Sequence, residues 1–194
     1  MKAGNGQHFE QCYNAQAAVE VDSRLIVGER VSSAPNDKQE LVASVAAIRP
    51  PVESVATVLT DSGFYSEAAI RTLERTGQGQ PTGTIVYAAE EKKEHHRTVS
   101  DLEQKPELEV PGPEASTSEV MKYRLRTAEG RAQYKLRQQT VEPGFGIIKS
   151  VLGFRQFLLR GLQKVELEWQ WVCLAYDLKR LHRMGAGLKM AAQG

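Results

Sequence analysis

The N-terminal part of the chain alternates between apolar and polar residues, which predicts a β-hairpin. From Tyr13 to Val21 the odd positions are apolar or aromatic, and most of the even positions are polar. This is the period of a half-buried strand. Asp22 and Ser23 then form a turn, and residues 25–31 return as a second β-prone segment. We therefore expect two antiparallel strands joined by a short turn.

Helices and strands are predicted to alternate in the next part of the chain. Residues 41–48 are rich in Ala, Val and Leu and precede two prolines, which favours a short helix. Residues 55–60 form a nearly unbroken β-prone run, typical of a strand covered on both faces. A helix is expected to open at Ser66 and to stop near Gly77, and residues 84–88 supply another strand.

The C-terminal part is predicted to be helical. Residues 118–149 have a helical pattern, which we expect to be interrupted at Gly130 and at Pro143. Residues 162–183 predict one long final helix with core-facing positions at helical spacing, among them Val165, Trp169, Val172 and Tyr176. On that helix Trp169 is expected in the core, whereas Trp171 points to the opposite side and is expected at the surface.

These elements predict an α/β protein in which helices flank a mixed sheet. The chain is expected to form one domain, with residues 1–89 as the N-terminal part of the core and residues 119–194 as a basic helical C-terminal part. Between them, residues 90–118 are predicted to be an acidic insert or loop that contains prolines. Asp61 ends a predicted central strand, and ligands bind in open α/β sheets at that edge.

Composition describes an ordinary globular protein and adds a contrast in local charge. The 194 residues are 41% hydrophobic and 25% charged, with a formal net charge of only +1. Residues 121–160 contain nine Lys or Arg and two acidic residues, whereas residues 89–119 contain nine acidic residues and four Lys or Arg. The opposite blocks suggest one segment that faces DNA and one solvated insert.

The remaining composition bears on the cellular location. Cys12 and Cys173 are far apart and fit neither a metal pattern nor a disulfide framework, so a cytoplasmic location is the simplest expectation. The sequence shows neither a targeting segment nor an apolar run long enough to span a membrane.

The pair His95–His96 lacks companion ligands at a suitable spacing, and we expect it to be exposed in the acidic insert.

Four residues near the C-terminus are spaced as an active-site strip would need them. They are Tyr134, Arg137, Glu142 and Lys149. Glu142 and Lys149 are seven residues apart, so on a helix they share one face. If Pro143 takes the first helical position, the carboxylate of Glu142 lies at a helix N-terminus, where backbone N–H groups favour its charged form.

This strip resembles the tyrosine-arginine-glutamate-lysine signature of bacterial insertion-sequence transposases of the DDE type. Three further segments resemble parts of the same family. They are Val55–Ser66, with Asp61 followed by Gly63 and an aromatic residue; Tyr13–Glu20, beginning Tyr-Asn-Ala-Gln; and Phe157–Gly161, ahead of the final helix. The four matches occur in the family's order and extend over nearly the whole chain.

The resemblance implies a ribonuclease-H-like fold and DNA as the partner. In this family three acids hold two Mg²⁺ ions, which catalyse DNA strand cleavage and joining by phosphoryl transfer. Asp61 and Glu142 would be two of the acids and the metal ligands. Arg137 and Lys149 would hold phosphates, and Tyr134 would position the DNA strand or a nucleotide.

The resemblance also leads us to expect an incomplete catalytic domain. In the family the core opens with a strand that bears the first acid, yet only twelve residues precede Tyr13 and none of them is Asp. We therefore expect an N-terminally truncated transposase that lacks the first strand and has no activity by itself. The alternative is a non-enzymatic DNA-binding or interaction module derived from a transposase. It would form a homo-oligomer or assemble with a full-length transposase.

Each candidate residue also has a simpler explanation. Asp61 followed by Ser and Gly is ordinary turn chemistry, and Glu142 alone could serve only as a helix-start carboxylate. The cationic residues of the strip could form a solvated helix face, with Arg137 spaced less typically for the family than the others. Glu20 or Asp22 could replace the missing acid, but their positions are explained more simply by a turn.

Overall fold

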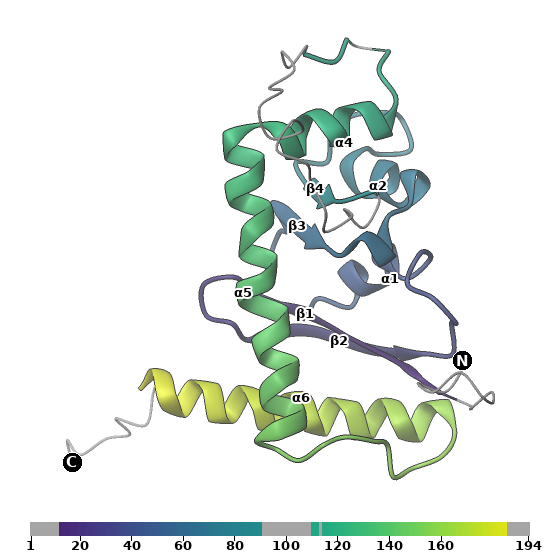
Figure 1. The fold of residues 1–194 in the computed structure, drawn as a ribbon. Coiled ribbons are helices and arrows are strands. Elements are labelled where there is room, and N and C mark those ends of the chain that lie inside the picture. The colour runs from purple at the N-terminus through teal and green to yellow at the C-terminus, as the bar shows by residue number, and fades with distance from the viewer. Residues whose placement is uncertain (1–11, 91–109, 113, 186–194) are drawn as a thin grey trace, which may run out of the picture. The chain divides into compact units, whose positions relative to one another are not determined.

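The computed structural model describes residues 12–90, 110–112 and 114–185, and the chain divides into two compact units. The first unit comprises Met1–Glu53 and Gln138–Gly194, and the second comprises Ser54–Arg137. Figure 1 shows the elements of both, coloured from purple at the N-terminus to yellow at the C-terminus. Each unit is described by itself.

The first unit combines a β-hairpin with a long helix. Strands β1 (Asn14–Val19) and β2 (Ile26–Ser32) pair in antiparallel fashion, as the alternating pattern predicts. A short helix, α1 (Leu41–Ala46), follows, and the long helix α6 (Leu162–Met184) packs against β2. The hairpin and the final helix expected from the sequence are both confirmed.

The core of the first unit is centred on Trp169 of α6. Its side chain is buried, and its indole Nε1–H donates a hydrogen bond of 2.9 Å to the Gln16 carbonyl of β1. Phe145 stacks on the indole with ring centroids 5.9 Å apart. On the same helix, the Tyr176 hydroxyl donates to the Arg24 carbonyl and the Asp177 carboxylate accepts the Ile26 N–H. These bonds fix α6 along the hairpin.

The second unit is built on a parallel pair of strands joined by a helix. Strand β3 (Thr57–Thr60) pairs with β4 (Ile85–Ala88), and α2 (Glu67–Glu74) forms the crossover between them. Ser66 caps α2 by accepting the Ala69 N–H, so the helix starts where the sequence predicts. Helix α4 (Thr117–Arg126) packs on α2 and β4 and opens with a capping box between Ser116 and Glu119.

The single mixed sheet predicted from the sequence is not seen in the described residues. The strands form two sheets of two strands each, β1–β2 and β3–β4. Strand β3 is also less buried than its apolar sequence suggests, because Thr57 is exposed and only Thr60 is fully buried. A β-prone run predicts that a strand forms, but it does not predict which other strand will pair with it.

The prediction of helix breaks at Gly130 and Pro143 is wrong, because the break lies at Thr127. Thr127 has an extended backbone between α4 and α5 (Ala128–Ser150), and its hydroxyl accepts the Gly130 N–H at 3.0 Å. Pro143 lies inside α5. Pro143 has no N–H to donate to the carbonyl four residues earlier, yet α5 continues to Ser150.

Gly130 is required by the close approach of two backbones at the α4–α5 junction. A Cβ at this position would lie 1.8 Å from the Arg124 carbonyl oxygen, so a substitution must displace the junction. We expect Gly130→Ala to lower the free energy of unfolding by about 1–3 kcal/mol. Denaturant unfolding of the variant measures this change.

Gly146, in the same helix, is the matched control. A Cβ there meets nothing within 4 Å, so Gly146→Ala should raise stability by about 0.5–1 kcal/mol through helix propensity alone. Equal effects of the two substitutions would contradict a special requirement for glycine at Gly130.

Candidate functional site

The first element of the candidate site is Asp61, which follows β3 directly. Its backbone is extended, and its carboxylate caps the short 3₁₀ helix η1 (Ser62–Phe64) by accepting the Ser62 N–H at 2.6 Å. The Asp61 side chain remains 57% exposed. Because β3 and β4 are parallel, Asp61 lies at the carboxyl edge of this pair, where α/β proteins bind ligands.

The second element is the pair Tyr134 and Arg137, which lie one turn apart on α5. The Arg137 guanidinium stands 5.4 Å from the centre of the Tyr134 ring, a cation–π arrangement. Its Nη1 lies 3.8 Å from Oδ2 of Asp61, which is an ion pair longer than a hydrogen bond. The structure thus brings together Asp61, Tyr134 and Arg137, although Tyr134 and Arg137 lie 73 and 76 positions after Asp61 in the sequence.

Tyr134 is held in a partly buried position beside the end of β4. Burial raises the pKa of Tyr134, while the Arg137 guanidinium and a hydrogen bond with the Ala89 backbone act in the opposite direction. The phenol is therefore neutral at physiological pH, and its ring provides a flat surface against which the guanidinium packs. Arg137 itself is only 19% exposed, so its orientation is set by packing rather than by solvent.

Glu142 and Lys149 lie in the part of α5 that belongs to the first unit. Both side chains are exposed and share one helix face, as their spacing predicts. The expectation that Glu142 sits at a helix N-terminus is wrong, because α5 begins at Ala128. Glu142 therefore receives no help from unpaired N–H groups at a helix start.

Two other segments that resemble the transposase family meet in the first unit. The Tyr13 hydroxyl accepts the Gly161 N–H at 3.0 Å, and the Tyr13 ring packs edge-on against Phe157 at 6.0 Å. The amides of Asn14 and Gln16 both donate to Oδ1 of Asp37, at 2.7 and 3.2 Å. These segments have a clear structural role, because they connect β1 to the loop before α6 and to the loop before α1.

Glu20 and Asp22, the two acids that could replace the missing first acid, lie in the turn between β1 and β2. Glu20 accepts the N–H groups of Asp22 and Ser23 at 3.1 and 2.6 Å, and the hydrogen bonds from Ser23 hold the pKa of Glu20 below its usual value. Asp22 is exposed in the same turn. His95 and His96 lie outside the described residues.

The chemistry of Asp61 and Glu142 fits a hard divalent cation, since each offers an exposed carboxylate. Oδ1 of Asp61 accepts hydrogen bonds from the Ser62 N–H and hydroxyl, while Oδ2 lies 3.8 Å from Nη1 of Arg137. In the part of the chain that the structure describes, no three His, Cys, Asp or Glu side chains are grouped as a metal centre would need. Each acid therefore fits as one ligand rather than as a complete site.

A comparison with models of known protein families shows which family the chain belongs to. A family model described as "Transposase DDE domain" matches residues 85–182, which is just over half of the sequence. The chain belongs to the transposase DDE domain family. The matched region of this transposase domain contains Tyr134, Arg137, Glu142 and Lys149, whereas Asp61 precedes it.

The transposase domain has no further match of this kind. Neither the curated proteins nor the solved structures contain a significant match to it. Among its described helices, none is long and apolar enough to cross a membrane. Family membership supports a role in DNA transposition and a divalent metal as cofactor, and the mixed α/β structure is consistent with the fold class predicted from the sequence.

Proposed function

We propose that this chain supplies metal-binding acids and phosphate contacts to DNA strand cleavage and joining in transposition. The observation that carries the proposal is the group formed by Asp61, Tyr134 and Arg137 at the carboxyl edge of β3 and β4, in a transposase DDE domain. It combines an acid suited to Mg²⁺ with a cation suited to a phosphate.

In this proposal each residue has a separate task. Asp61 and Glu142 would each offer a carboxylate to Mg²⁺, and the metal would supply activation of the attacking oxygen and stabilisation of the leaving oxygen. Arg137 donates N–H groups to a DNA phosphate, and Tyr134 keeps the guanidinium in place by lying against it. Lys149, exposed on α5, contributes a second phosphate contact.

The ion pair between Asp61 and Arg137 suggests how binding is coupled to the metal. The Asp61 carboxylate lies 3.8 Å from the guanidinium, so its negative charge would repel a phosphate that approaches Arg137. If Asp61 held a divalent cation, its charge would be neutralised and Arg137 could bind the phosphate. We therefore infer that Mg²⁺ strengthens DNA binding at this group, and that the strengthening requires Asp61.

Fluorescence anisotropy with a labelled DNA duplex, in Mg²⁺ and in a chelator, tests this proposal. We expect Arg137→Gln to weaken binding about tenfold and to reduce the salt dependence by about one counterion. Asp61→Asn should bind DNA more tightly than the wild type in the chelator, because it lacks the repelling charge. In Mg²⁺ this variant should gain much less affinity than the wild type gains, and Glu142→Gln should likewise gain less.

The matched controls are Arg75→Gln and Glu53→Gln. Arg75 is an exposed cation of the second unit outside the basic segment 121–160, and Glu53 is an exposed acid of the first unit. If Arg75→Gln weakens binding as much as Arg137→Gln, the contact is only general charge attraction. If Asp61→Asn and the wild type gain equally from Mg²⁺, Asp61 does not hold the cation.

A further inference from the structure

A cavity of about 500 Å³ in the first unit combines apolar walls with charged side chains. The cavity, which we name the α6 pocket, is lined by residues of α6 between positions 167 and 181 and by residues of the segments 25–29 and 49–52. All of these belong to the first unit, and the proposed DNA contacts use none of them. Pockets of this size and composition hold small organic molecules in many proteins.

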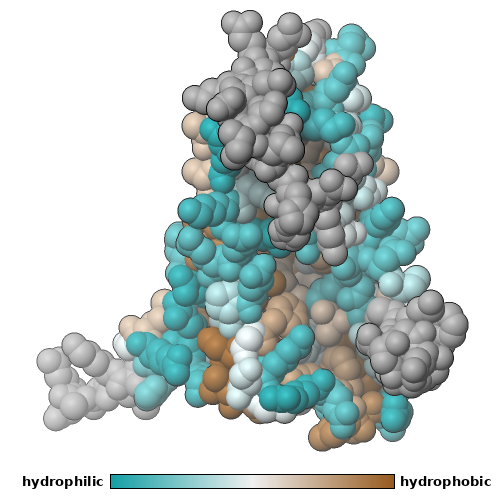
Figure 2. Space-filling model, viewed as in Figure 1, coloured by the Kyte–Doolittle hydropathy of each residue, from teal (hydrophilic) through white to brown (hydrophobic). Residues whose placement is uncertain are grey.

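The walls of the α6 pocket are mainly apolar. Leu167, Leu174 and Leu181 line it from α6, and Pro50 and Val52 line it from the segment that follows α1. Figure 2 shows brown, hydrophobic atoms gathered in the lower part of the view, where Figure 1 places α6 and the loop that leads into it. Leu167 and Leu174 are 52% and 46% exposed, so these walls are in contact with water. A ligand with an apolar body would gain free energy by covering them.

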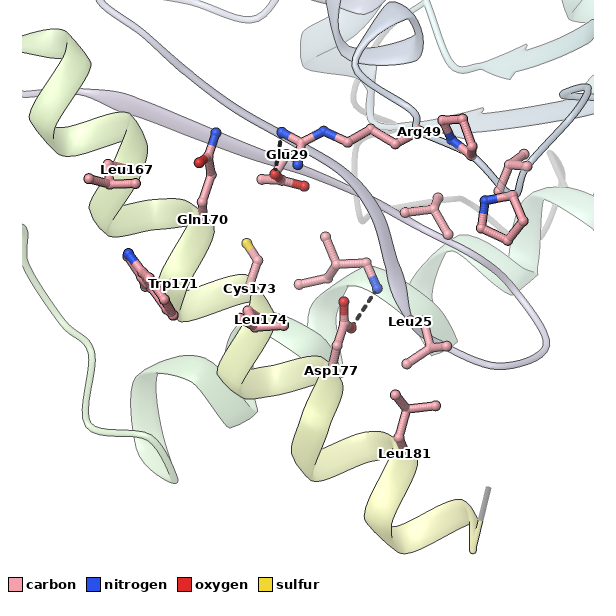
Figure 3. Close-up of a pocket in the computed structure, with 15 residues that line it drawn as sticks. Leu25, Glu29, Arg49, Leu167, Gln170, Trp171, Cys173, Leu174, Asp177 and Leu181 are labelled. Carbon is pink, nitrogen blue, oxygen red and sulfur yellow. Dashed lines mark hydrogen bonds and ion pairs between the residues drawn. The ribbon is translucent and has the colours of Figure 1, made fainter. Parts of the chain in front are cut away.

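The charged residues of the α6 pocket are two acids and one base. Arg49 and Glu29 neutralise each other, because Nη2 of Arg49 lies 2.6 Å from Oε1 of Glu29. The second acid is Asp177 of α6. Figure 3 shows the Arg49–Glu29 pair and, farther along α6, the Asp177 carboxylate. The lining therefore carries one negative charge more than it carries positive charges.

Asp177 is a half-buried carboxylate that has no cation beside it in the described part of the chain. Its Oδ1 accepts the Ile26 N–H at 2.8 Å. Burial raises the pKa of Asp177 to about 6, and the charge of Glu29 acts in the same direction. Arg180, one turn farther along α6, donates instead to the Ser23 carbonyl at 2.8 Å. A shielded carboxylate in this situation favours a ligand that brings a positive charge.

We propose that the α6 pocket binds a small organic cation that consists of an ammonium group on an apolar body. The ammonium group pairs with Asp177, whose carboxylate is already held in place by the Ile26 N–H, and the apolar body covers the leucines of α6. A metal ion suits the pocket less well, because it needs several oxygen ligands and the walls are apolar. The pocket shares no residue with the candidate site for DNA, so either property can fail without the other.

Three probes of similar shape and different charge test this proposal. They are phenylbutylamine, phenylbutanol and phenylbutyrate, which are positive, neutral and negative at about pH 7.5. In NMR titrations of the full chain, we expect the amine to bind about tenfold more tightly than the alcohol, because it adds one partly shielded ion pair. The carboxylate should bind more weakly than the alcohol. The amide resonance of Ile26, which contacts Asp177 directly, shows whether the probe occupies the α6 pocket.

Asp177→Asn removes the charge and keeps a carbonyl oxygen that can accept the Ile26 N–H. In this variant the amine should bind no more tightly than the alcohol, while the affinity for the alcohol should change by less than about twofold. Retained binding of the alcohol shows that the pocket is still folded. Glu114→Gln is the matched control, because Glu114 is an exposed acid of the second unit. It should leave the affinity for all three probes unchanged.

The pH dependence of amine binding is a second measure. Asp177 must be charged to pair with the ammonium group, and its pKa of about 6 means that it gains this charge as the pH rises. From about pH 5 to 7.5 the amine should therefore bind about fivefold more tightly. Arg49 stays positive over this range, and burial raises the pKa of Cys173, so its thiol stays neutral. Burial also raises the pKa of Glu29, so the change must disappear in Asp177→Asn to be assigned to Asp177.

Several results would overturn the proposal. If phenylbutyrate binds most tightly, Arg49 is the anchor and the α6 pocket is a site for anions. If the three probes bind equally, or none of them shifts the Ile26 amide resonance, the charge of Asp177 does not select a ligand. If Asp177→Asn and Glu114→Gln weaken amine binding equally, the preference for the amine is only general charge attraction.

Discussion

Replacing Trp169 by Ala should lower the free energy of unfolding by about 3–5 kcal/mol, the range for a large aromatic side chain removed from a core. Trp169 is 2% exposed and contacts three aromatic rings, those of Phe145, Phe154 and Phe157. The substitution leaves a cavity between α6 and the hairpin and removes the only hydrogen bond from the indole to the Gln16 carbonyl. Chemical denaturation followed by far-UV circular dichroism measures the loss.

Trp171→Ala is the matched control, since it removes the same side chain two positions away. The Trp171 ring is 64% exposed, so its loss should change stability by less than about 0.5 kcal/mol. Similar losses for both variants would contradict the assignment of Trp169 to the core.

The burial of Trp169 and the exposure of Trp171 could be predicted from the sequence, because the spacing of residues along a helix is a local property. Trp169 falls in line with Val165 and Tyr176, all of which are buried, while Trp171 falls on another face. The alternation around Asn14 and Gln16 likewise predicted the hairpin. On β1 the apolar positions pack against the core as expected but are only partly buried, and the one buried residue of the strand is the polar Gln16.

The break between α4 and α5 shows where local signals mislead. Gly and Pro usually interrupt helices, which placed the breaks at Gly130 and Pro143. The actual break depends on the hydroxyl of Thr127, which donates to the Arg124 carbonyl and accepts from Gly130. Threonine is common both inside helices and at their starts, so its role here becomes clear only from the three-dimensional contacts.

The candidate site could be predicted in part, from a family resemblance rather than from a local sequence pattern. Its members Asp61, Tyr134 and Arg137 were identified from resemblance to a family, and no local pattern indicates that Arg137 would reach Asp61. Arg137 was the residue whose spacing fitted the family least well, yet its guanidinium forms an ion pair with Asp61. The Ala89 backbone contact of Tyr134 gave no sequence signal, because any residue can supply a backbone group.

The arrangement of the second unit depends on one charged cluster that joins three of its elements. Arg124 of α4 donates to Glu74 of α2 at 2.5 Å and to the Val86 carbonyl of β4. The same Glu74 carboxylate accepts the Val86 N–H at 2.8 Å, and the guanidinium stands 5.6 Å from the centre of the Tyr87 ring. The side chains of Arg124 and Glu74 are only 19% and 21% exposed. Such shielded charges depend strongly on each other.

Arg124→Met should therefore lower the stability of the second unit by about 2–4 kcal/mol, since Glu74 is left as a shielded carboxylate without its cation. Because the chain has two compact units, the effect is best measured by amide hydrogen exchange at Val86 and Ala88 in β4. Exchange there should become at least tenfold faster, while amides of the β1–β2 hairpin should change little.

Lys122→Met provides the matched comparison on the same helix. Lys122 pairs with Glu90 at 2.8 Å, but its side chain is 57% exposed, so the loss should be at most about 1 kcal/mol. Arg124→Lys keeps the charge but loses the forked geometry that contacts Glu74 and Val86 together, and it should fall between the two. If Arg124→Met and Lys122→Met accelerate exchange in β4 equally, the cluster does not hold the edge of the sheet that carries Asp61.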